Sequence, residues 1–152
     1  MDGFRQVELD RRAVRAVRVE LVAEGRTDRL CFEGWQGFGL RVGVLASGTI
    51  RGLPGWRFRL DEQAVVRPLR WRVENRGVIT VKSPLGQFLL PFRGQVRGLP
   101  LVAEGECSVE GKSGALAGWR GVGTYAGSAG YRFQITFRLD WPNDLAEPWA
   151  LT

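Results

Sequence analysis

The 152-residue chain contains no histidine, and this single absence excludes several classes of active site. Ser-His-Asp and Cys-His arrangements need an imidazole as general base. Zinc sites are built mainly from cysteine and histidine, and the two cysteines, Cys31 and Cys107, lie far apart in the sequence. We therefore expect no catalytic residue of these kinds, no bound metal and no cofactor. Both thiols are expected to be free and buried among apolar neighbours.

Lysine is almost as scarce as histidine. Lys82 and Lys112 are the only two, so arginine supplies nearly all of the 22 positive side chains. Against 16 acidic residues, this leaves a formal net charge of +6. A basic surface attracts nucleic acid or another polyanion, whereas the same total also arises from arginine-rich coding spread over a solvated surface. Total charge alone does not separate these two interpretations.

Long apolar runs are also missing. No segment approaches the roughly 18 consecutive apolar residues that a membrane helix requires, and residues 1–14 lack the apolar centre of a signal peptide. We therefore expect a cytoplasmic protein with no membrane partner. A chain of this length fits one domain, and a hydrophobic content of 44% excludes a wholly disordered chain.

The chain does contain a repeated alternation of apolar and polar residues. In the clearest case, residues 131–140, five apolar side chains alternate with five polar ones. A period of two predicts a strand with one buried and one solvated face. The pattern recurs at 38–44, 56–61 and 69–74, and in further segments as far as residue 110. Residues 14–23 match helical spacing as well as strand spacing, and their β-branched valines favour a strand. These segments predict eight to ten strands and hardly any helix.

Clusters rich in glycine, proline and asparagine separate the predicted strands. Gly25–Asp28, Asn75–Gly77 and Ser83–Gly86 predict turns, and the last two indicate a meander of antiparallel strands. The predicted fold class is all-β, with a single antiparallel β-barrel of calycin-like type, closed or nearly closed, as one domain over residues 1–152. Closure removes exposed strand edges. Residues 141–152 hold two prolines and are predicted to form an irregular C-terminal tail.

Three segments in the C-terminal third resemble a known family. They are GQFLLPFRG at 86–94, SGALAGWRGVGTY at 113–125 and YRFQITFRLD at 131–140. Their order resembles a bacterial family of uncharacterised function whose members form allene oxide cyclase-like barrels. The central motif of that family, Gly-x-Leu-Ala-Gly-x-Arg-Gly, corresponds to Gly114, Leu116, Ala117, Gly118, Arg120 and Gly121. The chain lacks the histidines that family members often carry. The resemblance implies the barrel fold and no particular function, because fold does not fix function.

Aromatic side chains that the alternation directs inward form the first candidate site. In a small barrel such side chains either fill the interior as a packed core or line a pocket for one apolar ligand. The predicted function is accordingly a structural module or one that binds a small apolar ligand. The predicted ligand-binding residues are Trp56, Phe58, Trp71, Phe88, Phe92, Tyr131 and Phe133.

Arginines on the opposite faces of the same strands form the second candidate site. If neighbouring strands align them, they make a basic stripe that can bind a polyanion such as nucleic acid. This alternative ranks below ligand binding, because the same face can be solvated or lie in an oligomer interface, where arginine is enriched. We expect a homo-oligomer. The predicted polyanion-binding residues are Arg57, Arg59, Arg70, Arg72, Arg132 and Arg138.

An enzyme is the least favoured interpretation, and no catalytic residue is predicted. A cyclase or isomerase barrel would need a charged residue pointing into the barrel, and the alternation identifies none. The nearest carboxylates in sequence, Glu104, Glu106 and Glu110, fit a solvated strand face.

Overall fold

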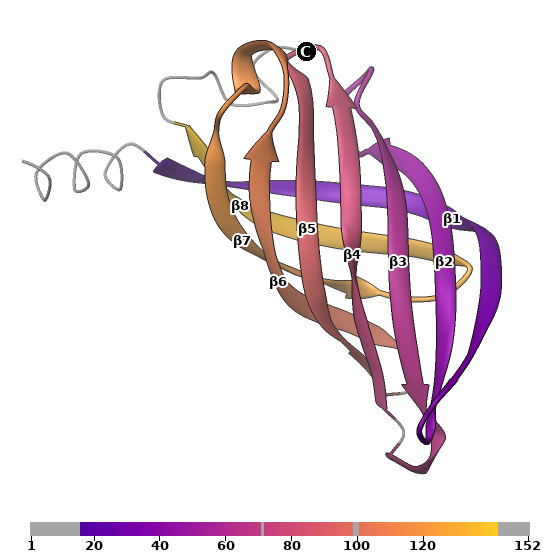
Figure 1. The fold of residues 1–152 in the computed structure, drawn as a ribbon. Helices are drawn as coiled ribbons and strands as arrows, with labels where there is room; N and C mark the ends of the chain where they lie inside the picture. The colour runs from indigo at the N-terminus through magenta and orange to yellow at the C-terminus, as the bar shows by residue number, and fades with distance from the viewer. Residues whose placement is uncertain (1–15, 71, 99–100, 143–152) are drawn as a thin grey trace, which may run out of the picture.

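The computed structural model describes residues 16–70, 72–98 and 101–142, and most of them lie in eight β-strands (Figure 1). Two single-turn 3₁₀ helices accompany the strands: η1 (Pro68–Arg70) and η2 (Gly114–Leu116). No helix in this part of the chain is long and apolar enough to cross a membrane. The strands are β1 (Ala16–Gln36), β2 (Gly39–Ile50), β3 (Arg57–Arg67), β4 (Arg72–Ser83), β5 (Gly86–Arg97), β6 (Val102–Gly111), β7 (Arg120–Ser128) and β8 (Arg132–Pro142).

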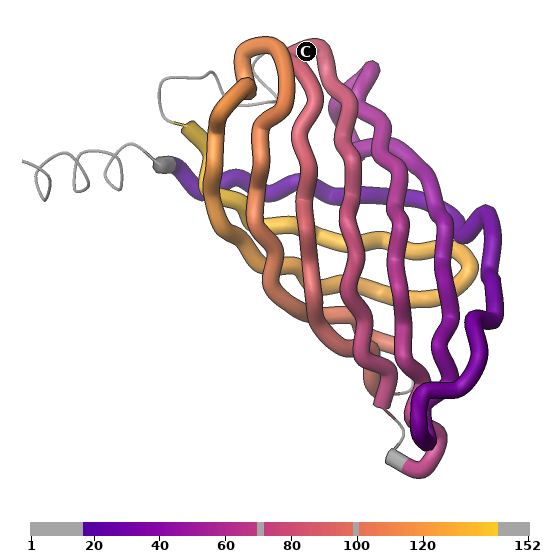
Figure 2. Tube along the Cα trace, in the orientation of Figure 1, coloured from indigo at the N-terminus to yellow at the C-terminus, as the bar shows by residue number. Residues whose placement is uncertain are grey.

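The eight strands form one closed antiparallel barrel. Each strand pairs with the next one along the chain, and β8 pairs with β1 to close the sheet. The predicted all-β barrel and its strand number are therefore confirmed. The long strand β1 serves two neighbours, because residues 16–26 pair with β8 and residues 23–36 pair with β2. Figures 1 and 2 show β1 crossing behind the other strands and then bending to run beside β2.

The hairpin of β1 and β2 extends beyond the start of β8. Residues 29–36 of β1 pair with β2, whereas the β1–β8 pairing ends at Arg26 and Arg132. Directly opposed residues in an antiparallel pair share one face, so Leu30 and Phe32 face the same way as their partners Val44 and Val42. This is the inner face, which continues to the buried Ala46. Because Phe32 is 76% exposed, this end of the barrel is open.

The opposite end of the barrel is filled by aromatic side chains. Trp56, Phe88 and Trp141 pack against one another, with ring centroids 6.2 to 6.4 Å apart. Leu116 of η2 is completely buried and belongs to the same core. Burial of large apolar side chains contributes about 1.5–3 kcal/mol each, so this end supplies much of the stability.

Two of the predicted turns are wrong, because the strands continue through them. Gly25–Asp28 lies inside β1 and Asn75–Gly77 lies inside β4. In each, the glycine faces the barrel interior where space is short, and it allows the strand to bend without ending. The turn at Ser83–Gly86 is confirmed, with the Ser83 hydroxyl donating to the Gly86 carbonyl at 2.8 Å.

The predicted start of the C-terminal tail is also wrong. Trp141 and Pro142 belong to β8 and pair with Val17 and Ala16 of β1. The remainder of the tail, 143–152, lies outside the described residues. Cys107 is a buried free thiol as predicted, whereas Cys31 is free but only half-buried.

Inward-facing glycines narrow the middle of the barrel. A Cβ on Gly48 would overlap the backbone of Glu24, and one on Gly77 would overlap the carbonyl of Asp61. Gly94 has the same relation to the carbonyl of Glu104. Neighbouring strands therefore approach one another more closely at these positions than any side chain would permit.

Replacing Gly48 with alanine should destabilise the protein by about 2–3 kcal/mol, because the added methyl group meets backbone that cannot move aside. Gly43 lies on the same strand but faces outward, where its Cβ would meet mainly the flexible end of Glu33. The control Gly43→Ala should change stability by no more than about 0.5 kcal/mol. Urea unfolding monitored by tryptophan fluorescence measures both, and equal effects would contradict the close approach.

Candidate functional site

The structure places most of the predicted ligand-binding aromatics in the interior. Trp56, Phe58, Phe88 and Phe92 are buried, and Phe133 is half-buried with its ring 6.0 Å from that of Phe58. Trp71 lies outside the described residues. Each of the five placed rings contacts another ring, so these side chains form the packed core.

Tyr131 is the exception, and its predicted inward position is wrong. Its side chain is 66% exposed. It lies in the hairpin between β7 and β8, one residue before β8 begins at Arg132. The alternation extends by one residue beyond the strand, and outside the strand it does not fix the direction of a side chain.

A carboxyl side chain does point into the barrel. Glu62 alternates with Leu60 and Ala64 on β3, and both neighbours are buried on the inner face. The expectation that no charged side chain faces inward is therefore wrong. The alternation was followed only to residue 61, whereas β3 continues to Arg67, and a single glutamate in an apolar row carries no distinctive sequence signal.

Glu62 has two buried polar neighbours, Asn75 of β4 and Tyr125 of β7. Asn75 is 7% exposed and Tyr125 is 4% exposed. The Tyr125 ring packs at 5.5 Å from Phe92. Its hydroxyl extends over Gly105, where a Cβ would lie 2.6 Å from the oxygen. The glycine thus creates the space that the phenol occupies.

Burial changes the acidity of this cluster. It raises the pKa of the Glu62 carboxyl above its usual value of 4.5, and the Asn75 amide partly opposes this shift. Burial also raises the pKa of the Tyr125 hydroxyl, with the charge of Glu62 acting in the same direction. The Cys107 thiol has its pKa raised by burial to about 11. At neutral pH the phenol and the thiol therefore keep their protons, and Glu62 takes up a proton more readily than an exposed carboxylate.

Two atoms of the cluster lack a hydrogen-bond partner. The Asn75 amide lies close enough to Glu62 and Tyr125 to favour the ionised form of each. Within the described part of the chain, however, neither Asn75 Oδ1 nor Tyr125 Oη forms a well-aligned hydrogen bond. A buried polar atom left unsatisfied costs about 1–3 kcal/mol. The cluster can therefore accept a hydrogen-bonding group from a bound molecule.

The predicted outer arginines divide between two grooves. Arg57, Arg59 and Arg132 share one groove of about 720 Å³ on the outside of β1, β2 and β3. Arg72 and Arg138 line another, of about 1370 Å³, and Arg138 forms an ion pair with Glu20 at 3.0 Å. The side chain of Arg70 lies outside the described residues. The predicted basic stripe is thus only partly assembled.

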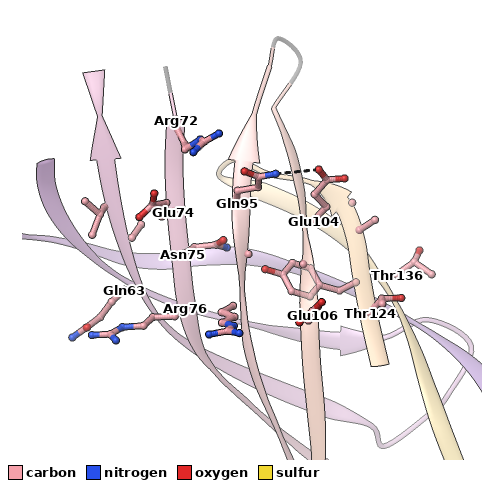
Figure 3. A pocket seen from close by; sticks show the side chains of 18 of the residues that line it. Gln63, Arg72, Glu74, Asn75, Arg76, Gln95, Glu104, Glu106, Thr124 and Thr136 are labelled. Atoms are coloured by element: carbon pink, nitrogen blue, oxygen red, sulfur yellow. Dashed lines mark hydrogen bonds between the residues drawn. The ribbon is translucent and has the colours of Figure 1, made fainter. Parts of the chain in front are cut away.

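The larger groove crosses the outside of the barrel between two rows of side chains (Figure 3). One row includes Gln63, Arg76 and Glu106, and the other includes Gln95 and Glu104. Gln95 Nε2 donates to Glu104 Oε1 at 3.5 Å. Six arginines and four glutamates line this groove, so its charge is mixed. No metal-binding group of three or more acidic, cysteine or histidine side chains occurs among the described residues.

Glu62→Gln should be more stable than the wild type at neutral pH. Because the folded-state pKa of Glu62 is raised, the wild type loses stability as the pH rises from about 4.5 through that folded-state pKa. The variant has no carboxyl to ionise at this position. The difference in stability between variant and wild type should therefore be small at pH 4, increase above pH 4 and then level off. Thermal unfolding between pH 4 and pH 8 measures this. The control Glu106→Gln, on the exposed outer face, should run parallel to the wild type, and a parallel Glu62→Gln curve would contradict the burial.

Comparison with known proteins assigns neither a family nor a function to the chain. No protein-family model and no curated protein sequence matches the chain. The likeness to the bacterial family with allene oxide cyclase-like barrels therefore stays a prediction.

Proposed function

We propose that the protein binds a small, uncharged amphipathic molecule inside the open end of its barrel. The observation that carries the proposal is a pair of buried atoms beside Glu62, Asn75 Oδ1 and Tyr125 Oη, which have no hydrogen-bond partner among the described residues. A hydroxyl or amide group of the ligand would donate to Asn75 Oδ1, and a ligand oxygen would accept from the Tyr125 hydroxyl. An uncharged ligand is favoured because a buried charge would lose its hydration.

The apolar part of the ligand would lie along the inner face of the β1–β2 hairpin. Phe32 and Trp35 share this face with their partners Val42 and Leu40, and both aromatic side chains are exposed. Apolar surface left open to water at the mouth of a barrel is typical of a ligand-binding site. This arrangement moves the predicted site away from the packed aromatic core and toward the open end.

A proton-transfer reaction on the bound molecule is the second candidate function. The raised pKa of Glu62 favours it, because a carboxyl with a pKa closer to neutrality exchanges protons more effectively at physiological pH. Glu62→Gln should then retain ligand binding and abolish conversion of the ligand, which mass spectrometry of the bound molecule would detect. Self-association also stays a prediction, and light scattering of the purified protein tests it.

Tyr125→Phe should raise the free energy of unfolding by about 1 kcal/mol, because it removes a buried hydroxyl that has no partner. The same change should weaken ligand retention at least fivefold, measured by native mass spectrometry of the co-purified molecule and by titration with the neutral probe N-phenyl-1-naphthylamine. Tyr131→Phe removes the same atom from an exposed side chain and should change neither property. A loss of stability in Tyr125→Phe, or unchanged binding, would contradict the proposal.

Phe32→Ser tests the apolar half of the site. Because Phe32 is already exposed, the substitution should alter stability by less than about 0.5 kcal/mol while reducing the affinity for the naphthylamine probe several-fold. Phe38→Ser, also at an exposed aromatic but in the turn between β1 and β2, is the matched control. Equal loss of probe binding in both variants would show that the probe reports general surface hydrophobicity.

A further inference from the structure

Four exposed cations without an acidic partner surround the smaller groove on the outside of the barrel. They are Arg57, Arg59, Lys82 and Arg132, and none of them forms an ion pair with another described residue. Acidic side chains near the groove are already engaged. Arg26 pairs with Asp28 at 3.7 Å, and Glu24 pairs with Arg51. The groove therefore carries an uncompensated positive charge.

The strand register arranges these cations in two adjacent rows. Directly opposed residues point to the same face, and one row consists of Arg132, Arg26, Ser47, Arg59 and Thr80. The second row consists of Gln134, Glu24, Thr49, Arg57 and Lys82. The backbone of Gly25 and Gly48 lies between the rows. Both glycines face the barrel interior, so the strand backbone forms the floor of the groove between the two rows.

The dimensions of the groove fit a chain of anions better than a single ion. Arg132 and Arg59 lie on strands three spacings apart, which corresponds to about 14 Å across the sheet. Thr80 lies beside Arg59 in the first row and Thr49 lies beside Arg57 in the second, and both hydroxyls can donate to phosphate oxygens. Several positive charges with neutral hydroxyl donors beside them are typical of a surface that follows a phosphodiester backbone.

An exposed aromatic residue lies at one end of the groove. Tyr131 directly precedes Arg132, and its backbone carbonyl accepts a hydrogen bond from Thr27 N at 2.8 Å. This bond holds the β7–β8 hairpin against β1. The Tyr131 side chain is largely solvent-exposed. A base can stack on such a ring while the neighbouring arginines bind phosphates.

We propose that this groove binds single-stranded nucleic acid, with Arg57, Arg59 and Arg132 on the phosphates and Tyr131 stacking on a base. The site is independent of the interior cluster, because it lies on the outer face of the same strands. A single strand is favoured over a duplex because the groove is narrow and its aromatic residue needs an unpaired base.

The chain offers a matched control with the same charge. Arg76 and Arg93 lie directly opposite each other on β4 and β5, and both are exposed and form no ion pair among the described residues. They line the larger groove of mixed charge. Reversing two charges at either place changes the net charge by the same amount. A difference in affinity between the two variants therefore shows that binding depends on the smaller groove and not on net charge.

Fluorescence anisotropy with a labelled 20-mer of oligo-dT tests the proposal on the full chain at 20 to 200 mM NaCl. R57E/R59E should bind at least tenfold more weakly than the wild type, and its slope of log K against log salt should fall by about 1.4 for two lost phosphate contacts. R76E/R93E should stay within about threefold of the wild type. Tyr131→Ala should bind roughly tenfold more weakly with an unchanged salt slope, because stacking releases no counterions.

Three outcomes would overturn the proposal. An equal loss of oligonucleotide affinity in R57E/R59E and R76E/R93E would show that the oligonucleotide is attracted by net charge alone. Equal affinity for a 20-base-pair duplex would remove the preference for a single strand. Binding of heparin without any binding of the oligonucleotide would assign the groove to another polyanion. Circular dichroism of each variant checks that the barrel is intact, and because all substituted side chains are exposed, folding should be retained.

Discussion

The close approach of neighbouring strands at inward-facing glycines is the constraint on which the rest of the structure depends. At Gly48, Gly77 and Gly94 the backbone of the adjacent strand occupies the place of a side chain. This lets the strands bend around a narrow centre, so that eight strands suffice to close the sheet. The packed end, the open end and both outer grooves are positioned by that closure.

The narrow centre divides the interior into two chemically different parts. One end is filled by Trp56, Phe88 and Trp141, which pack without space for a guest. Toward the other end, Asn75 and Tyr125 introduce buried polar atoms that have no hydrogen-bond partner among the described residues. The packed core and the proposed ligand site therefore lie toward opposite ends of one barrel, and the inner and outer faces of its strands carry separate candidate sites.

The fold class could be predicted from the sequence because a period of two is a strong and redundant signal. The segment 131–140 predicts most of β8 from its side chains alone. Two predicted turns were wrong, because Gly25 and Gly77 allow a strand to bend in this barrel, whereas in most sequences glycine marks the end of a strand. Local pattern contains no information about how closely another strand will approach.

A candidate site could be predicted from the sequence where its residues lie on one strand, and not where they come from several strands. Arg57 and Arg59 lie on one strand, so their shared outward face follows from spacing, whereas their proximity to Arg132 depends on the closure of β8 onto β1. The interior cluster was missed because its members come from three strands, β3, β4 and β7. Its defining property, two atoms without partners, exists only when those strands are assembled.

The pairing of β1 with β8 also has a consequence for how the molecule is made. The hydrogen bond between Glu20 and Arg138 joins positions 118 apart in the sequence, and such non-local pairing slows folding. During synthesis β1 leaves the ribosome before β8, so the edge of β1 that faces β8 stays unpaired until β8 has been made. In that interval the nascent chain presents an open strand edge to other chains, and the charged side chains Arg18 and Glu20 on β1 protect it from premature association.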